Sequence, residues 1–150
     1  MLTRRDWIRS SLAGVATMLV AKRAAAAPPP VVTVYKDAGC ECCAKWVKHL
    51  NANGFVVTVR DVVDMDEIKR TMNVPVKLRS CHTAVVGKYV IEGHVPASAI
   101  KKLLAEKPAA LGLAAPGMPM GSPGMEGDRV DHFDVVAFDR DGKSRVYEKR

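Results

Sequence analysis

The amino-acid sequence predicts an α/β domain in which helices flank a mixed β-sheet. Strand-like and helix-like stretches alternate in the order β-α-β-α-β-β-α, which is typical of a sheet covered by helices on both faces. A C-x-x-C pair, Cys40 and Cys43, directly follows the first strand-like stretch. Together these observations predict a thioredoxin- or glutaredoxin-like fold. A hairpin pattern near the end of the chain predicts an added C-terminal β-hairpin.

The first strands and the first helix are predicted from hydrophobic patterning and helix-end signals. Residues 31–36 form an apolar run typical of a buried strand, and residues 55–59 form a second one. Between them a helix is expected over 42–53, ended by Gly54. Its inward face is expected to carry Ala44, Val47 and Leu50.

The second helix has a clear start signal. Asp64 is a good N-cap, and Glu67 three residues later completes a capping-box pattern. The helix is expected to run through Met72, with Met65 and Met72 in the core, and to be broken by the proline of 74–76.

Two strands and a helix are expected next. Residues 83–86 and 88–92 form short apolar runs joined at Gly87. Pro96 is well placed in the first turn of a helix, which we expect to extend to Lys107.

The last part of the chain is predicted to be a long loop followed by a hairpin. Residues 109–128 are rich in Gly, Pro and Ala and show no periodicity, so a loop is expected. Strand-like residues 133–138 and 144–148 flank a turn sequence at 139–143, which predicts the C-terminal hairpin.

The first 27 residues have the layout of an export signal. Twin arginines, Arg4 and Arg5, precede an apolar run, and four alanines follow it before a run of prolines. This layout favours the Tat route, with cleavage after the alanines. The apolar run is shorter than the roughly 20 residues needed to span a bilayer. We therefore expect residues 28–150 to form a periplasmic domain without stable membrane insertion.

The net charge of +7 does not indicate a nucleic-acid partner. Five basic residues and one acidic residue lie within 1–27, which leaves 18 basic and 15 acidic residues in the rest of the chain. That balance is ordinary for a soluble domain. Aromatic residues amount to 5%, which also argues against a base-stacking surface.

Four cysteines carry the main functional signal. Cys40, Cys42 and Cys43 stand at the start of the first helix, and Cys81 precedes a later strand. A helix start favours thiolates, which are ligands for soft metals. In the predicted fold the loop of Cys81 faces the C-x-x-C, so we expect the four thiols side by side. The spacing matches neither paired zinc ligands nor iron–sulfur motifs, so Cu(I) fits best, as one ion or a small thiolate-bridged cluster.

Two other uses of the cysteines stay open. In the first, Cys40 and Cys43 are a catalytic dithiol–disulfide pair, with Cys40 attacking and Cys43 resolving. In the second, the cysteines form structural disulfides, which an oxidising compartment favours. Because oxidation and metal binding compete for the same sulfur atoms, we expect this pair to be reduced when metal is bound and bridged when the site is empty.

Histidines and methionines offer further ligands. His82 adjoins Cys81 and is the best candidate for an extra ligand or a donor to the ligands. His94 is expected mainly to cap or pack, and His49 and His132 are expected at the surface. Thioethers suit Cu(I), so the long loop is a candidate lid through Met118, Met120 and Met125. The alternative is that these methionines cover apolar surface.

Four short motifs occur in order along the chain. They are Gly39-Cys40-Glu41-Cys42-Cys43, Ser80-Cys81-His82-Thr83-Ala84, Tyr89-Val90-Ile91-Glu92-Gly93-His94-Val95-Pro96, and the Gly- and Pro-rich run of 116–126. Together they resemble the CopG-like family of exported bacterial proteins, which are associated with copper resistance and have a thioredoxin-like fold. The resemblance covers nearly all of residues 31–150. It implies copper binding through Cys40, Cys42, Cys43 and Cys81, and also allows a redox role for these thiols.

The sequence therefore predicts a periplasmic protein that binds copper ions as Cu(I) for copper resistance. It is expected to sequester the ion or to pass it to another periplasmic copper protein. The alternative is a periplasmic thiol–disulfide or copper oxidoreductase that uses Cys40 and Cys43.

Overall fold

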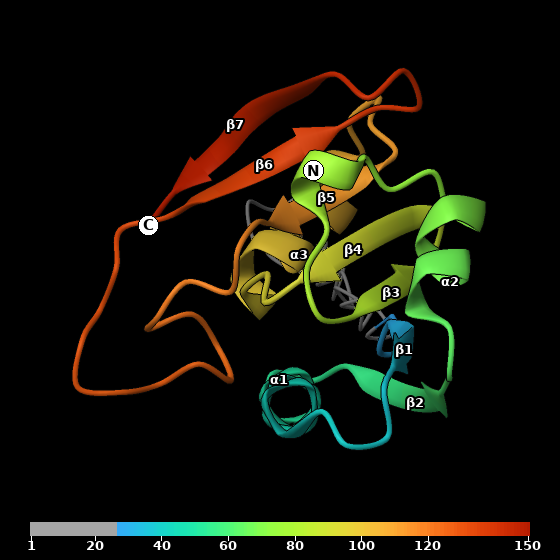
Figure 1. The fold of residues 1–150 in the computed structure, drawn as a ribbon. Coiled ribbons are helices and arrows are strands. Elements are labelled where there is room, and N and C mark those ends of the chain that lie inside the picture. Colours follow the sequence, from blue (N-terminus) through green and yellow to red (C-terminus); the bar gives the residue numbers. More distant parts are fainter. Residues whose placement is uncertain (1–26) are drawn as a thin grey trace, which may run out of the picture.

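The computed structural model describes residues 27–150, and the predicted export signal lies outside this part except for Ala27 (Figure 1). In the described part, seven strands form one sheet in the order β2-β1-β3-β4-β5-β6-β7. The sheet is mixed, and within residues 27–150 three α-helices flank it, so the predicted α/β class is confirmed. No helix in residues 27–150 has the length and apolar character to cross a bilayer.

The elements alternate along the chain as the hydrophobic patterns predict. They are β1 (Val31–Lys36), α1 (Glu41–Ala52), β2 (Val56–Asp61), α2 (Met65–Thr71), the 3₁₀ helix η1 (Val76–Leu78), β3 (Thr83–Val86), β4 (Tyr89–Gly93), α3 (Ala97–Glu106), β5 (Gly112–Ala115), β6 (Asp134–Phe138) and β7 (Ser144–Lys149). The boundaries of the predicted elements agree within two residues. The Asp64 carboxylate accepts a hydrogen bond from the Glu67 N–H at 2.9 Å, which confirms the predicted cap of α2.

Strand directions bring two loops that are distant in sequence to the same end of the neighbouring strands β1 and β3. β1 is parallel to β2 and antiparallel to β3, and Tyr35 of β1 pairs with Thr83 of β3. The residues that follow β1 therefore lie beside the residues that precede β3. The chain segment of Cys40 thus meets the segment of Cys81 by strand register alone.

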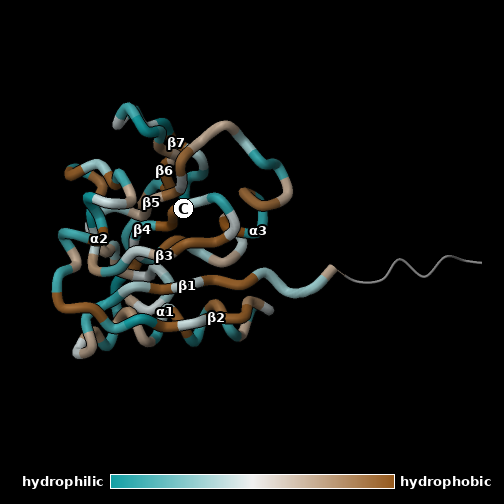
Figure 2. Tube along the Cα trace, turned by 90° about the vertical axis from the view of Figure 1, so that its right-hand side faces the viewer, coloured by the Kyte–Doolittle hydropathy of each residue, from teal (hydrophilic) through white to brown (hydrophobic). Residues whose placement is uncertain are grey.

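Hydrophobic residues fill both faces of the sheet, and hydrophobic stretches run through the central strands (Figure 2). α1 and α3 cover one face, and α2 with η1 covers the other, where a smaller cluster is centred on Phe138. α1 faces the core through Cys43, Trp46 and Leu50, whereas Ala44 is exposed, so the predicted inward face was wrong there. Burying the large indole contributes more than burying a methyl group, and it sets the rotation of the helix.

The predicted loop over 109–128 contains a strand, β5, which is a second correction. Gly112–Ala115 is buried, parallel to β4 and antiparallel to β6, and it joins the C-terminal hairpin to the sheet. Gly112 permits this packing, because a Cβ there would lie 1.8 Å from the Val90 carbonyl oxygen. Gly-Leu-Ala-Ala has little intrinsic strand preference, so the pairing comes from tertiary contacts.

Other side-chain expectations had mixed outcomes. His132 is exposed as predicted. His49 is half-buried and its Nε2 accepts a hydrogen bond from the Ala97 N–H at 3.0 Å, so its expected surface position was wrong. Met65 and Met72 are half-buried, and Met72 packs against the smaller cluster.

Candidate metal centre

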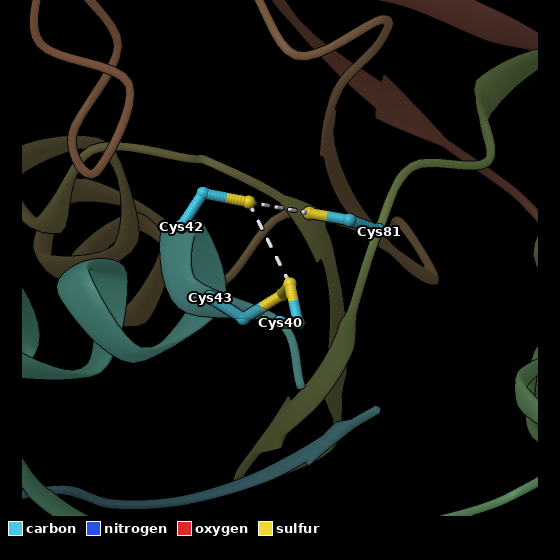
Figure 3. Close-up of side chains that lie close together, drawn as sticks. All are labelled: Cys40, Cys42, Cys43 and Cys81. Carbon is cyan, nitrogen blue, oxygen red and sulfur yellow. Dashed lines mark hydrogen bonds between the residues drawn. A yellow bond between two sulfur atoms is a disulfide. The ribbon is translucent and has the colours of Figure 1, made fainter. Parts of the chain in front are cut away.

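The four cysteines converge at the N-terminus of α1. Cys40 is the N-cap residue, Cys42 and Cys43 lie in the first turn, and Cys81 stands directly before β3. Cys42 Sγ lies 3.6 Å from Cys40 Sγ and 4.0 Å from Cys81 Sγ (Figure 3). All four sulfur atoms fall within 4.8 Å of one another. The expected position of Cys81 beside the other three is confirmed.

These distances match the size of a thiolate metal site. With metal–sulfur bonds of about 2.3 Å, sulfur atoms on opposite sides of one ion lie about 4.6 Å apart at most. Cys42 Sγ and Cys81 Sγ, at 4.0 Å, need little movement to bind a common ion. The donor set is entirely sulfur, which suits a soft ion.

Two of the four cysteines are oxidised to a disulfide and the other two are reduced. Cys40 and Cys43 form a disulfide with a Cα–Cα distance of 5.3 Å, while Cys42 and Cys81 are free thiols. Cys43 is fully buried and Cys40 is half-buried, so the Cys40 sulfur is the one of the pair that a second molecule can reach. The pair also lies at a helix N-terminus, which favours a thiolate once the bond is reduced.

The Cys81 thiol is held in its protonated form. Burial raises the pKa of Cys81 to about 12, and the neighbouring Cys42 adds to the increase. A contact from the Ser80 hydroxyl, 3.9 Å from the sulfur, acts in the opposite direction. A metal ion that binds Cys81 as thiolate must therefore displace a proton, which links metal affinity to pH.

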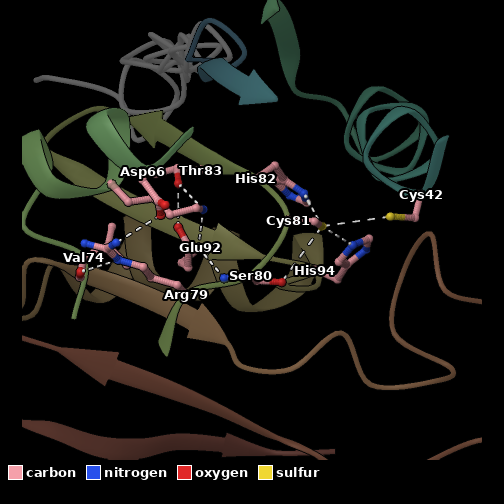
Figure 4. Close-up of polar contacts among 11 residues, drawn as sticks. Cys42, Asp66, Val74, Arg79, Ser80, Cys81, His82, Thr83, Glu92 and His94 are labelled. Carbon is pink, nitrogen blue, oxygen red and sulfur yellow. Dashed lines mark hydrogen bonds and ion pairs between the residues drawn. The ribbon is translucent and has the colours of Figure 1, made fainter. Parts of the chain in front are cut away.

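Two histidines contact the Cys81 sulfur (Figure 4). Nε2 of His94 lies 3.0 Å from Cys81 Sγ, and Nδ1 of His82 lies 3.3 Å from it. Burial lowers the pKa of both imidazoles, so both rings are neutral at neutral pH. Cys81, His82 and His94 form a second group of donor atoms that shares its sulfur with the four-cysteine group.

His94 is the residue whose place sequence reasoning missed. Thr83 pairs with Glu92 across the β3–β4 hairpin, so continuing the register sets Cys81 opposite His94. The turn at Gly87 carried this information, because the length of a hairpin turn fixes which residues face each other.

A buried ion pair holds the ends of the Cys81 loop. Lys69 Nζ donates to Glu92 Oε1 at 2.6 Å and to Thr83 Oγ1 at 2.9 Å. The Ser80 N–H also donates to Glu92 Oε1, and the Thr83 hydroxyl donates to Oε2, each at 2.6 Å. Burial raises the pKa of Glu92, while Lys69 and the other donors oppose that rise. Ser80, directly before Cys81, and Thr83, two residues after it, are thus both hydrogen-bonded to the Glu92 carboxylate (Figure 4).

The loop between β5 and β6 swings back toward α1 (Figure 1) and supplies the methionines. An open cavity of about 610 Å³ lies beside Cys40 and Cys42, and its walls also include Met118, Met120 and Met125. Met118 is 42% exposed and Met120 is half-buried. The structure therefore brings the predicted thioether donors and two of the cysteines to the same cavity.

Solved structures with a similar sequence and fold are known. The chain matches "Copper resistance protein copG- Form 2" with 47% sequence identity and a TM-score of 0.77. It matches "Copper resistance protein copG- Form 1" with 47% identity and a TM-score of 0.76. Each match covers 81% of this chain and 98% of the other.

Two further comparisons concern families and curated proteins. The family described as "Protein of unknown function, DUF411" matches residues 78–125, which include Cys81, His94 and the methionines of the loop. No curated protein matches the chain. Because nearly the whole length of the two CopG structures is matched at 47% identity, this chain belongs to the CopG-like family.

Proposed function

We propose that the protein binds Cu(I) in the periplasm through Cys40, Cys42, Cys43 and Cys81 and so contributes to copper resistance. The observation that carries this proposal is the gathering of four sulfur atoms within 4.8 Å at a helix N-terminus. The names of the similar solved structures, copper resistance protein CopG, support the choice of metal. The order of β2, β1, β3 and β4 also supports a thioredoxin-like assignment for this part of the sheet.

The cavity beside Cys40 and Cys42 supports a soft ion. Its walls carry the thioethers of Met118, Met120 and Met125 together with Cys40 and Cys42. Sulfur ligands of both kinds select Cu(I) over Mg²⁺, Ca²⁺ or Mn²⁺, which prefer oxygen. Met118 and Met120 are proposed as additional ligands or as an entry route for the ion.

Copper capacity should depend on the Cys40–Cys43 disulfide. With this bond intact, Cys42 and Cys81 are the thiols available, and Cu(I) accepts two sulfur ligands. A dithiol reductant that gives two electrons and two protons opens the bond, becomes a disulfide itself, and frees two more thiols. The four-thiolate site, with one ion or a small bridged cluster, is the reduced form.

An anaerobic Cu(I) titration against a strong competing chelator tests the proposal. The fully reduced protein is expected to retain copper at chelator levels that strip Cys81→Ser, with an affinity loss of at least tenfold or a lower stoichiometry. Circular dichroism of each variant controls for folding. Unchanged affinity and stoichiometry in both Cys81→Ser and Cys42→Ser would overturn the four-cysteine site.

A second function is favoured by the disulfide itself. Cys40 is half-buried and Cys43 is fully buried, which suits an attacking and a resolving thiol in an oxidoreductase. Acting on copper, the two thiols would give two electrons to two Cu(II) ions, leaving the disulfide, two Cu(I) ions and two protons. Insulin reduction or Cu(II) reduction that is lost in Cys40→Ser and retained in Cys81→Ser, with weak copper retention, would support this alternative.

Export is proposed from the sequence of residues 1–27, which lie almost wholly outside the described part. Replacing Arg4 and Arg5 with lysine should keep the unprocessed protein in the cytoplasm if the Tat route is used. Cell fractionation measures this, and processing at the normal level in the double variant would argue for another route. The proposed partner is a second periplasmic copper protein that receives the ion.

A further inference from the structure

We propose that His94 and His82 act on the Cys81 sulfur in opposite ways. His94 binds the metal ion through Nε2 beside Cys81, whereas His82 does not bind metal and donates its Nδ1–H to the Cys81 sulfur. This inference rests on the proposed function, because it assigns ligands at the same site. It is carried by the second nitrogen of each ring, which faces the Pro123 carbonyl oxygen in His94 and has no hydrogen-bond partner among the described residues in His82.

The Pro123 carbonyl fixes the tautomer of His94. Nδ1 of His94 lies 2.7 Å from the Pro123 carbonyl oxygen, and a carbonyl oxygen can only accept. The proton of the neutral ring is therefore on Nδ1. The lone pair of Nε2 is left facing Cys81 Sγ at 3.0 Å. A histidine that binds metal almost always donates its other N–H in this way, to a carbonyl or carboxylate.

Gly124 allows the carbonyl to come this close. A Cβ at Gly124 would lie 2.7 Å from the Cys42 carbonyl oxygen, 2.9 Å from the Trp46 nitrogen and 3.2 Å from His94 Nδ1. The loop therefore packs its backbone directly on the first turns of α1. The orientation of His94 is set by a segment about 30 residues away along the chain, as its contact with Pro123 shows.

His82 lacks the partner that a metal ligand needs. Its Nδ1 lies 3.3 Å from Cys81 Sγ, while Nε2 is buried and has no hydrogen-bond partner among the described residues. The ring is fully buried against Trp46, with ring centroids 4.4 Å apart. If Nδ1 bound a metal ion, the proton would have to sit on Nε2, for which no acceptor among the described residues has hydrogen-bond geometry. Such orphaned donors are rare in folded proteins.

With the proton on Nδ1, the one N–H of the His82 ring has an acceptor, the Cys81 sulfur. The N–H then points at the Cys81 sulfur, and only the lone pair of the buried Nε2 is left without a partner among the described residues. The contacts are also compatible in the metal-free protein, where the Cys81 thiol donates to His94 Nε2, the nearer of the two nitrogens. In the metal-bound protein, the N–H of His82 withdraws electron density from the thiolate, which raises the reduction potential of the bound ion.

Long-range ¹H–¹⁵N NMR of the imidazole rings tests this assignment in metal-free protein. Both rings are expected to show the Nδ1–H tautomer. An Nε2–H tautomer of His82 would overturn its donor role, and an Nε2–H tautomer of His94 would overturn its ligand role. No copper is needed for this readout.

Addition of Cu(I), which is diamagnetic, provides the second readout. The ¹⁵Nε2 resonance of His94 is expected to shift strongly, while both nitrogens of His82 shift weakly. His94→Gln should lose copper affinity at least tenfold, whereas His82→Gln should keep the stoichiometry and lower the potential of the bound ion. If Cu(I) strongly shifts the cysteine resonances but leaves those of His94 unchanged, the His94 assignment is overturned while the proposed function stands. If Cu(I) moves no resonance of the site, the proposed function fails as well.

Discussion

Lys69 Nζ lies 2.6 Å from Glu92 Oε1, and both side chains are buried, with 4% and 0% of their surfaces exposed. Removing one member of a buried pair leaves the other charge without a partner, which costs about 3–5 kcal/mol. Lys69→Met is therefore expected to lower the free energy of unfolding by about that amount. Urea denaturation of the metal-free protein measures the loss.

The double variant Lys69→Met/Glu92→Leu is the control for this prediction. Removing both charges is expected to restore part of the stability, because no unpaired ion remains. The recovery should be incomplete, since the Ser80 N–H and the Thr83 hydroxyl also lose their acceptor. A Lys69→Met variant as stable as the wild type would mean that the pair does not hold the Cys81 loop.

The raised pKa of Cys81 predicts slow alkylation. In Cys42→Ser with the Cys40–Cys43 disulfide intact, Cys81 is the one free thiol of the described residues. Its reaction with iodoacetamide should accelerate with pH well beyond the ordinary thiol pKa of about 8.5, because burial, the largest cause of the shift, remains. A plateau in the pH–rate curve near pH 8.5 would contradict the prediction, and the same curve for unfolded protein in urea is the reference.

The same shift predicts a loss of stability in alkaline solution. The folded state keeps the Cys81 proton up to a pKa of about 12, whereas the unfolded chain releases it near 8.5. Stability from this group is complete below the unfolded pKa and falls as the pH rises through the folded pKa. Between pH 8 and pH 11 the unfolding free energy of the wild type should fall more than that of Cys81→Ser. A pH-independent difference would show that Cys81 has an ordinary pKa.

Gly124→Ala should weaken copper binding without removing any ligand. The new Cβ would push the loop away from α1 and release His94 from the Pro123 carbonyl. Losing such a partner typically costs about 10–100-fold in metal affinity. Competition with a Cu(I) chelator measures the change.

Gly117→Ala is the matched control in the same loop. Gly117 also has a positive φ, +79° against +89° for Gly124, but a Cβ there meets nothing within 4 Å. It therefore carries the backbone strain without the clash. Equal copper affinities for the two variants would indicate that strain, and not the displaced Pro123 carbonyl, causes the effect.

The methionine loop can be tested by removing sulfur at nearly constant volume. Met118→Leu and Met120→Leu together should lower Cu(I) affinity several-fold if the thioethers bind the ion, while stability stays within about 1.5 kcal/mol. Met72→Leu, which lies away from the cavity, is the control. Unchanged Cu(I) affinity in the double variant would show that these methionines only cover apolar surface and do not bind the ion.

Much of the fold could be predicted from local signals, and its exceptions share one cause. The cap at Asp64, the hairpin turn after β6 and the apolar runs of β1 and β3 each act within a few residues, so they are visible in the sequence. β5 has no such signal, since its four small residues become a strand only between β4 and β6.

The candidate site divides in the same way. The sequence determined the soft, sulfur-rich character of the site, because three cysteines at a helix start are close in space whatever the rest of the chain does. The tertiary structure alone decided the approach of His94 to Cys81 and the burial of the ion pair behind the loop. These features depend on strand register and on contacts between segments distant along the chain, where no local preference acts.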